Sequence, residues 1–299
     1  MADGAGATHA ADLDRAARRG GHASWRTVRA TLSGAGAVGG LVVLVVALAA
    51  TFAPWVAPND PVALDPPARL LGPTTEHWLG TDQYGRDTLS RIVYGGRASL
   101  SVAAASTLFA LLVGGTLGVL AAFYRGWVDG LIMRITDVLL SFPAILLAIA
   151  LLAFLGPGFV NLVLAIGLVY VGPFARVARG AVLTVREELF VEASRSLGSR
   201  DWRVLLRAVL PAAAAPIIVE VTLRLAYGIL AEASLSFLGL GTQPPAASWG
   251  LMVAEGRRFL SLNAWATVAP GLAIMVTVLG FNLFGDALRD ALDPRTRGR

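Results

Sequence analysis

Three charged residues lie within one long apolar stretch of the sequence, between Ala212 and Phe237. Glu220 and Arg224 are four residues apart, which places them on one face of a helix, and Glu232 lies near the end of the same stretch. Charges in apolar surroundings are costly, so they usually pair with each other or contact a solute, an ion or a proton. For Glu220 and Arg224, a solute contact and a structural ion pair both remain open. Glu232 could contact an amine or accept hydrogen bonds from backbone N–H groups of a loop.

The residue types that are missing exclude several kinds of chemistry. The chain has no cysteine, which excludes disulfides, thiolate catalysis and cysteine metal sites. Its three histidines, His9, His22 and His77, lie outside the apolar stretches, so a Ser-His or HExxH site within them is not available. All 25 basic residues are arginine, and a GxxxxGK[ST] phosphate loop requires a lysine. The sequence therefore predicts neither a metal site nor an enzyme, and any ATP must bind to another chain.

The composition predicts an α-helical membrane protein. Of the 299 residues, 56% are hydrophobic and only 15% are charged, where about a quarter is usual. The apolar residues form six runs of about twenty residues, long enough to cross a hydrocarbon core of roughly 30 Å as helices. The six predicted spans are Val38–Val56, Ser99–Phe123, Val138–Leu155, Phe159–Val177, Ala212–Phe237 and Trp265–Phe284. Residues 1–33 lack an apolar period and are predicted to form a flexible tail.

The arginines predict the orientation of the spans. With both ends of the chain in the cytoplasm, the inner segments contain 18 of the 25 arginines and the outer loops contain six. The positive-inside rule favours this arrangement, with both termini cytoplasmic. Because the same distribution accounts for the net charge of +5, nucleic acid is not expected as a partner.

The inner loop between spans four and five, residues 186–211, has the pattern of a structured element. Glu187 to Leu197 has the apolar spacing of a short amphipathic helix, and Gly198 is expected to end that helix in the left-handed conformation. Ser199 to Arg207 is predicted to form a second short helix before Pro211. Such a rigid projection either lies on anionic lipid headgroups or docks in the cleft of a partner, and the residues alone leave both open.

The same loop resembles a known motif. Glu192-Ala193-Ser194, three residues, Gly198, nine residues and Ala208 to Pro211 is similar to the EAA loop of bacterial ABC importer permeases, EAA-x3-G-x9-I-x-LP. Ser194 and Ala208 depart from that pattern, and both changes are to small or apolar residues. The resemblance implies a loop that seats in a groove of an ATP-hydrolysing subunit. The implied coupling residues are Glu192, Ala193, Gly198, Ser199, Arg200, Asp201, Trp202 and Arg203.

Further segments resemble the peptide and nickel branch of this family, in its C-type permease. They are Leu79–Asp82 with Gly85–Asp87, Glu232–Gly241, and the ending Phe281–Pro294. The resemblance implies a type I importer bundle, with a first span in residues 34–77 and a five-span permease core in residues 78–297. It also implies a cytoplasmic-membrane heterodimer with a second permease, two ATPase subunits that hold ATP and Mg, and an outer solute-binding protein. No cofactor is expected in this chain, and the cargo would be a di- or oligopeptide or a related small solute.

An alternative class is a stand-alone secondary transporter or channel that uses Glu220, Arg224 and Glu232 as ion or proton sites. An intramembrane hydrolase is not supported, because no histidine or cysteine is available as a base or nucleophile. Two local patterns concern packing. Gly114 and Gly118 form a GxxxG pair that allows close helix approach, with a partner permease as one candidate and chance spacing as the other. Asp137 and Arg134, at i and i+3, predict an ion pair at the inner end of span three.

Overall fold

The computed structural model describes residues 34–292, so the predicted tail of residues 1–33 and the last basic residues lie outside the described part of the chain. The described residues fold into helices and loops, as the sequence predicts. The elements are α2 (Gly34–Thr51), α3 (Ala53–Val56), η1 (Pro66–Ala68), α4 (Thr88–Ala110), η2 (Leu111–Gly115), α5 (Thr116–Tyr124), α6 (Gly126–Leu140), α7 (Ala144–Leu155), α8 (Phe159–Arg186), α9 (Leu189–Ser196), α10 (Asp201–Val204), η3 (Leu205–Val209), α11 (Leu210–Phe237), α12 (Trp249–Gly256), η4 (Arg257–Phe259) and α13 (Trp265–Leu292).

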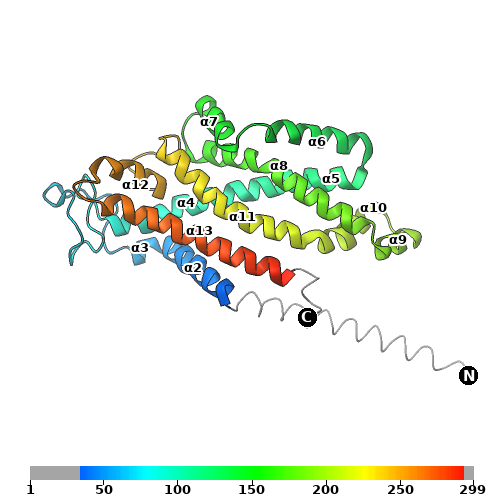
Figure 1. Ribbon diagram of the computed structural model, residues 1–299, viewed down its shortest axis with the longest axis horizontal. Coiled ribbons are helices and arrows are strands. Elements are labelled where there is room, and N and C mark those ends of the chain that lie inside the picture. The colour runs from blue at the N-terminus through cyan, green and yellow to red at the C-terminus, as the bar shows by residue number, and fades with distance from the viewer. Residues whose placement is uncertain (1–33, 293–299) are drawn as a thin grey trace, which may run out of the picture.

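Five helices of the described chain are long and apolar enough to cross a membrane, and a bent pair makes up to six. The five are α2, the continuous helix from α4 through α5, α8, the continuous helix from α10 through α11, and α13; the bent pair is α6 with α7. They lie at the six places that the apolar runs predict, which confirms the polytopic all-α fold. Figure 1 shows the long helices running along one common direction, with α9 and α10 at one end and α12 at the other.

The third span differs from its prediction. A single helix over Val138–Leu155 was expected, but α6 and α7 meet at an angle of 88°. The break falls at Ser141 to Pro143, where Pro143 precedes the first turn of α7 with ψ at 127°. A residue before proline avoids the helical conformation and proline itself has no N–H to donate, so the helix ends there. Gly156 and Gly158, both at positive φ, then turn the chain into α8.

Glycines allow the helices to approach closely within the chain. A Cβ on Gly114 would lie 2.3 Å from the Val171 carbonyl oxygen, and one on Gly118 would lie 2.2 Å from the Ala175 carbonyl oxygen. The GxxxG pair therefore packs η2 and α5 against α8 of the same chain, and the interpretation as a contact with a partner permease is wrong for these two glycines. Gly39 likewise allows α2 to approach α13 closely, and these two helices lie side by side in Figure 1.

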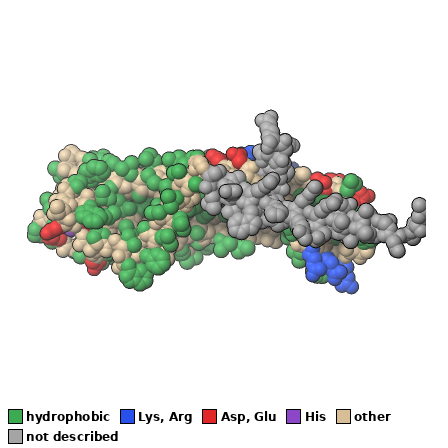
Figure 2. Space-filling model, turned by 90° about the horizontal axis from the view of Figure 1, so that it is seen from below, with side chains coloured by type: hydrophobic (Ala, Val, Ile, Leu, Met, Phe, Trp, Pro, Cys, Tyr) green, Lys and Arg blue, Asp and Glu red, His purple; other side chains and the backbone are tan. Residues whose placement is uncertain are grey.

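Much of the outer surface of the bundle is apolar. Figure 2 shows hydrophobic side chains over most of the visible middle of the molecule, on the side of α2 and α13. On α2 the exposed side chains include Val38, Leu41, Leu44, Val45 and Leu48. Apolar side chains of this kind are expected where a helix faces lipid, because no free energy is gained there by burying them inside the protein.

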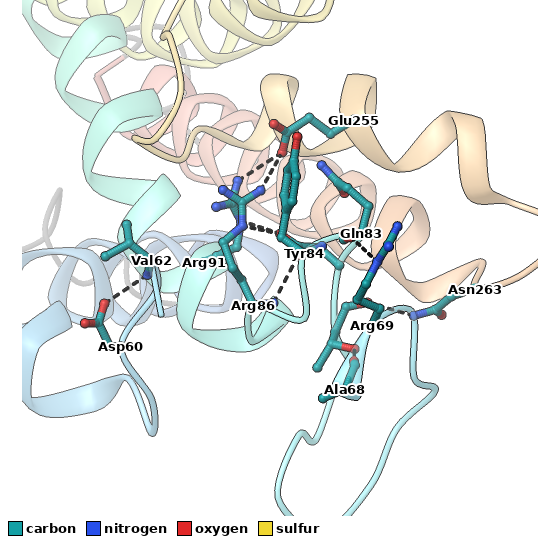
Figure 3. A network of polar contacts seen from close by, with 12 residues as sticks. Asp60, Val62, Ala68, Arg69, Gln83, Tyr84, Arg86, Arg91, Glu255 and Asn263 are labelled. Atoms are coloured by element: carbon teal, nitrogen blue, oxygen red, sulfur yellow. Dashed lines mark hydrogen bonds and ion pairs between the residues drawn. The ribbon is translucent and has the colours of Figure 1, made fainter. Parts of the chain in front are cut away.

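A folded polar cap closes the end of the bundle opposite α9. Arg86 donates from Nε to Asp82 Oδ2 at 2.6 Å, and Arg86 and Arg91 both donate from Nη2 to Glu255 Oε2, at 3.2 and 3.1 Å. Figure 3 shows the two arginines converging on Glu255, which extends from α12. Asn263 adds hydrogen bonds from Nδ2 to the Leu71 and Thr81 carbonyl oxygens. The Leu79–Asp87 segment singled out in the sequence thus ties the first loop to the α12 region.

Candidate coupling loop and polar face of the bundle

The loop between α8 and α11 contains a sharp, hydrogen-bonded bend. Helix α9 ends where Gly198 takes a φ of +78°, in the left-handed region expected for it. The Gly198 N–H donates to the Arg195 carbonyl oxygen at 2.9 Å, and the Ser199 N–H donates to the Ser194 carbonyl oxygen at 3.2 Å. These two bonds form a Schellman motif, which satisfies the last carbonyl groups of the helix. The bend between α9 and α10 is therefore defined by backbone hydrogen bonds.

A small hydrophobic core attaches this bend to the long helices. Val191 of α9 and Val204 of α10 are buried, and they cluster with Val182 of α8, Ala122 of α5 and Ala213 of α11. The Arg186 Nη1 at the end of α8 also donates to the Ala122 carbonyl oxygen at 2.7 Å. Packed side chains of this cluster therefore join α9 and α10 to α5, α8 and α11.

The other side of the bend is exposed. The Leu189 side chain is 80% exposed and that of Leu197 is 85% exposed, although their spacing predicts one apolar helix face. Of the eight residues implied as coupling residues, Ser199 is half-buried and the rest are exposed: Glu192, Ala193, Gly198, Arg200, Asp201, Trp202 and Arg203. Arg203 lies over the Trp202 ring at 5.8 Å. The loop thus presents apolar and charged side chains together on a projection at one end of the bundle.

The second short helix predicted for this loop is not separate from span five. Helix α10 continues through η3 into α11, so that Asp201–Phe237 forms one helix. Pro211 was expected to mark a boundary, because it lacks an N–H and its ring crowds the carbonyl group four residues earlier. The chain instead widens into a π turn over η3, in which the Leu210 N–H bonds to the Leu205 carbonyl oxygen. A wider turn of this kind accommodates the proline without ending the helix.

Two ion pairs join α6 to α8. Arg179 binds Asp129 with two hydrogen bonds of 2.5 and 2.6 Å, and Arg176 donates to Asp137 at 2.7 Å. The predicted pairing of Asp137 with Arg134 is therefore wrong, because a residue of the neighbouring helix offers a closer partner. The sequence gives no sign that Asp129 pairs with Arg179, because the two residues are 50 positions apart.

Glu220 and Arg224 do form an ion pair on one face of α11. Arg224 donates from Nε to Glu220 Oε1 at 2.5 Å. The guanidinium carbon lies 5.1 Å from the centre of the Tyr170 ring, on α8, and 5.7 Å from that of the Tyr227 ring. The Arg224 side chain is 22% exposed and Tyr227 is 53% exposed, so the group opens onto the surface of the chain. Tyr227 follows Arg224 at i+3, a spacing visible in the sequence, whereas Tyr170 gives no such signal.

Glu232, the third charged residue of this span, lies inside the chain and is 0% exposed. Its carboxylate accepts hydrogen bonds from Ser99 of α4 and from Ser236, each at 2.7 Å. The Ser99 hydroxyl in turn accepts from the Trp249 N–H of α12, at 3.3 Å. Glu232 therefore holds α4, α11 and α12 together in this conformation, and a contact with solute would require these hydroxyl groups to move away.

Comparisons with known proteins agree with this geometry. Residues 114–298 match the family of binding-protein-dependent transport system inner membrane components. Residues 34–73 match the N-terminal transmembrane domain of oligopeptide transport permease C. A dipeptide transport permease, DppC, of Alkalihalophilus pseudofirmus is 45% identical over 87% of this chain and 86% of its own length. A glutathione transport permease, GsiD, of Pectobacterium atrosepticum is 45% identical over 86% of each chain.

The fold also has a solved counterpart. An inward-facing structure of the MetNI methionine ABC transporter covers 69% of this chain and 98% of its own, with a TM-score of 0.58 and 19% sequence identity. At that identity the likeness concerns the fold, which is that of a type I importer permease. The identity to the sequence relatives extends over nearly the whole chain, and the family match covers more than half of it. The chain therefore belongs to the family of inner-membrane components of binding-protein-dependent transport systems, the permeases of ABC importers.

Proposed function

We propose that this permease moves di- or oligopeptides, or a related small solute, across the cytoplasmic membrane. The observation that carries the proposal is the exposed bend at Gly198. The small hydrophobic core described above attaches this bend to three spans. Similar permeases are named for dipeptides, di/tripeptides and glutathione, and this supports a peptide-like cargo. A stand-alone channel or secondary transporter would have no use for a rigid projection of this kind.

The projection is proposed to dock in separate ATP-hydrolysing subunits. Those chains would bind ATP and Mg, since this one has no lysine for a phosphate loop. The exposed Leu189, Leu197 and Trp202 would fill an apolar groove of the partner, and the arginines around them would contact its rim. Closure of the ATPases would then push α9. The small hydrophobic core around Val191 and Val204 would carry that movement to α5, α8 and α11.

The face of α11 that contains Glu220, Arg224 and Tyr227 is proposed to line the transport path. An arginine at the centre of a membrane helix costs roughly 2.5–3.5 kcal/mol, so it faces protein or water in preference to lipid. The apolar exposed side chains of α2 are suited to lipid instead. A second permease chain would cover the α11 face and complete the path as a heterodimer.

The same arrangement supports an orientation with both termini in the cytoplasm. The start of α2 and the end of α13 lie toward the end of the bundle that carries α9 (Figure 1). If α9 meets cytoplasmic ATPases, both termini of the chain are cytoplasmic, in agreement with the arginine distribution. The polar cap around Glu255 would then lie outside, where a solute-binding protein delivers its cargo.

Gentle purification of the tagged chain from its native membrane tests the proposal. Mass spectrometry should find a second permease and P-loop ATPases, and scrambling residues 192–198 should remove the ATPases while the chain remains inserted. The purified complex should take up a radiolabelled dipeptide into liposomes only with ATP. A chain that purifies alone and moves solute without ATP would contradict the proposal.

A further inference from the structure

We propose that Arg224 is a binding site for a carboxylate group of the solute, halfway along the transport path. The inference rests on the proposed function, because it assigns a chemical role to the α11 face that is proposed to line the path. The guanidinium group of Arg224 lies within cation–π distance of both the Tyr170 and the Tyr227 ring, and Glu220 accepts a hydrogen bond from its Nε.

The depth of the group suits a site within the path. Arg224 lies 14 residues after Leu210 and 13 residues before Phe237, the two ends of α11. At 1.5 Å per residue it is about 20 Å from each end of α11, close to the middle of this part of the continuous helix. Tyr170 lies 11 residues into α8, which runs in the opposite direction, or about 16 Å from its outer end. Both helices therefore bring their part of the group to the same level.

The hydrogen-bonding capacity of Arg224 is only partly used. Nε–H donates to Glu220, while Nη1 and Nη2 have no hydrogen-bond partner among residues 34–292. The side chain is 22% exposed, so these N–H groups can be reached from the surface of the chain. The edge of a guanidinium group presents parallel N–H donors at the spacing of the two oxygens of a carboxylate. The unused donors of Arg224 thus match a carboxylate.

Glu220 makes the site suitable for transient binding. Its carboxylate cancels the positive charge of Arg224, so the cluster has no net charge to trap an anion. A site along a path must bind strongly enough to admit the solute and weakly enough to release it. The same carboxylate would repel a ligand of higher negative charge, such as a phosphate ester. A peptide, with one free carboxylate at its C-terminus, fits both conditions.

The test compares two forms of one probe in the complete transporter. The purified complex, with its partner permease, ATPases and binding protein, is reconstituted in liposomes and supplied with ATP. Uptake of radiolabelled dialanine and trialanine is compared with uptake of their C-terminal amides. Each rate is divided by the occupancy of the binding protein, measured separately by equilibrium binding, so that recognition by that protein does not enter the ratio.

The wild type should take up the free acids about tenfold faster than the amides, which corresponds to about 1.4 kcal/mol. The double variant Glu220→Gln/Arg224→Gln keeps an amide hydrogen bond in place of the ion pair, and its ratio should fall to near one. Arg224→Lys keeps the charge but loses the parallel N–H donors of the guanidinium group, and its ratio of acid to amide uptake should fall at least threefold.

An unchanged ratio in the double variant, recovered in normal amount with its partners, would overturn the inference and leave a structural ion pair. If the double variant cannot be recovered, an unchanged ratio in Arg224→Lys has the same consequence. A wild-type complex with no preference for the free acid would also overturn it. If the wild type takes up neither the acids nor the amides, the proposed peptide function itself fails, and this inference fails with it.

Discussion

Substitutions at Gly198 test whether the bend between α9 and α10 is required for coupling. The residue has a φ of +78°, and a Cβ built on it would meet no atom within 4 Å. Any penalty for a new side chain therefore comes from the backbone conformation and not from a clash. Three substitutions separate these effects: Gly198→Asn, Gly198→Ala and Gly198→Pro.

The expected cost rises along this series. Asparagine tolerates the left-handed region best after glycine, so Gly198→Asn should cost well below 1 kcal/mol. Alanine at this φ should cost about 1–2 kcal/mol. Proline is held near a φ of −65°, and it removes the N–H that donates to the Arg195 carbonyl oxygen at 2.9 Å. Gly198→Pro therefore cannot form the Schellman motif at all.

Three quantities are measured for each variant: the amount of the chain in the membrane, the recovery of ATPase subunits with it, and ATP-driven uptake. All three variants should insert normally, because the long helices do not depend on this turn. Uptake should stay near the wild-type rate for Gly198→Asn, fall severalfold for Gly198→Ala, and fall at least tenfold for Gly198→Pro, in each case in parallel with ATPase recovery.

Normal uptake by Gly198→Pro would refute the role of the bend. A loss in Gly198→Asn as large as that in Gly198→Pro would refute the argument from backbone conformation. It would show instead that the partner occupies the open space beside Gly198, so that any side chain there is excluded.

Three further substitution pairs test packing and polar contacts by thermal unfolding in detergent. Gly118→Ala should lower the unfolding temperature, because overpacking typically costs about 1–3 kcal/mol. The control Gly180→Ala lies in open space on α8 and should not lower it. Equal effects would contradict the close contact of α5 with α8. Asp129→Asn should destabilise more than Asp137→Asn, since an amide can accept only one of the two hydrogen bonds from Arg179 and this site is the less exposed of the two. The reverse order would count against that geometry. Glu232→Ala should cost about 2 kcal/mol, because the buried hydroxyl groups of Ser99 and Ser236 lose the acceptor to which they donate, while Glu232→Gln should retain most of the stability. A tolerated alanine would show that these hydrogen bonds contribute little.

The number and position of the spans could be predicted from the sequence, because an apolar run of about twenty residues has few alternatives to a membrane helix. The shape of the third span could not. Its apolar residues continue through Phe142 without a change of pattern, and only Pro143 signals the break. Proline is not a reliable signal by itself, since Pro211 lies in a helix that continues through a π turn. What decides between the two outcomes is the packing of each helix against its neighbours.

The loop between α8 and α11 also has features that the sequence predicts and features that it does not. The left-handed turn at Gly198 follows from a local rule about helix ends, and the sequence contains all that the rule needs. The burial of the loop does not follow, because an amphipathic pattern shows which side chains share a face and not what covers that face. The structure buries Val191 and leaves Leu189 and Leu197 exposed. The apolar face predicted for α9 therefore does not pack on its own chain.

The two unequal surfaces of the bundle bear on how it is assembled. On α2, exposed side chains such as Leu41 and Val45 are aliphatic and suited to lipid. On α11, Arg224 and Tyr227 keep polar groups at the surface about halfway along the helix, where lipid offers no hydrogen bonds. Water or another polypeptide must satisfy them, and a chain that lined a path alone would leave this face open on one side. In our proposal, the face that binds solute is therefore also the face that a second permease would cover.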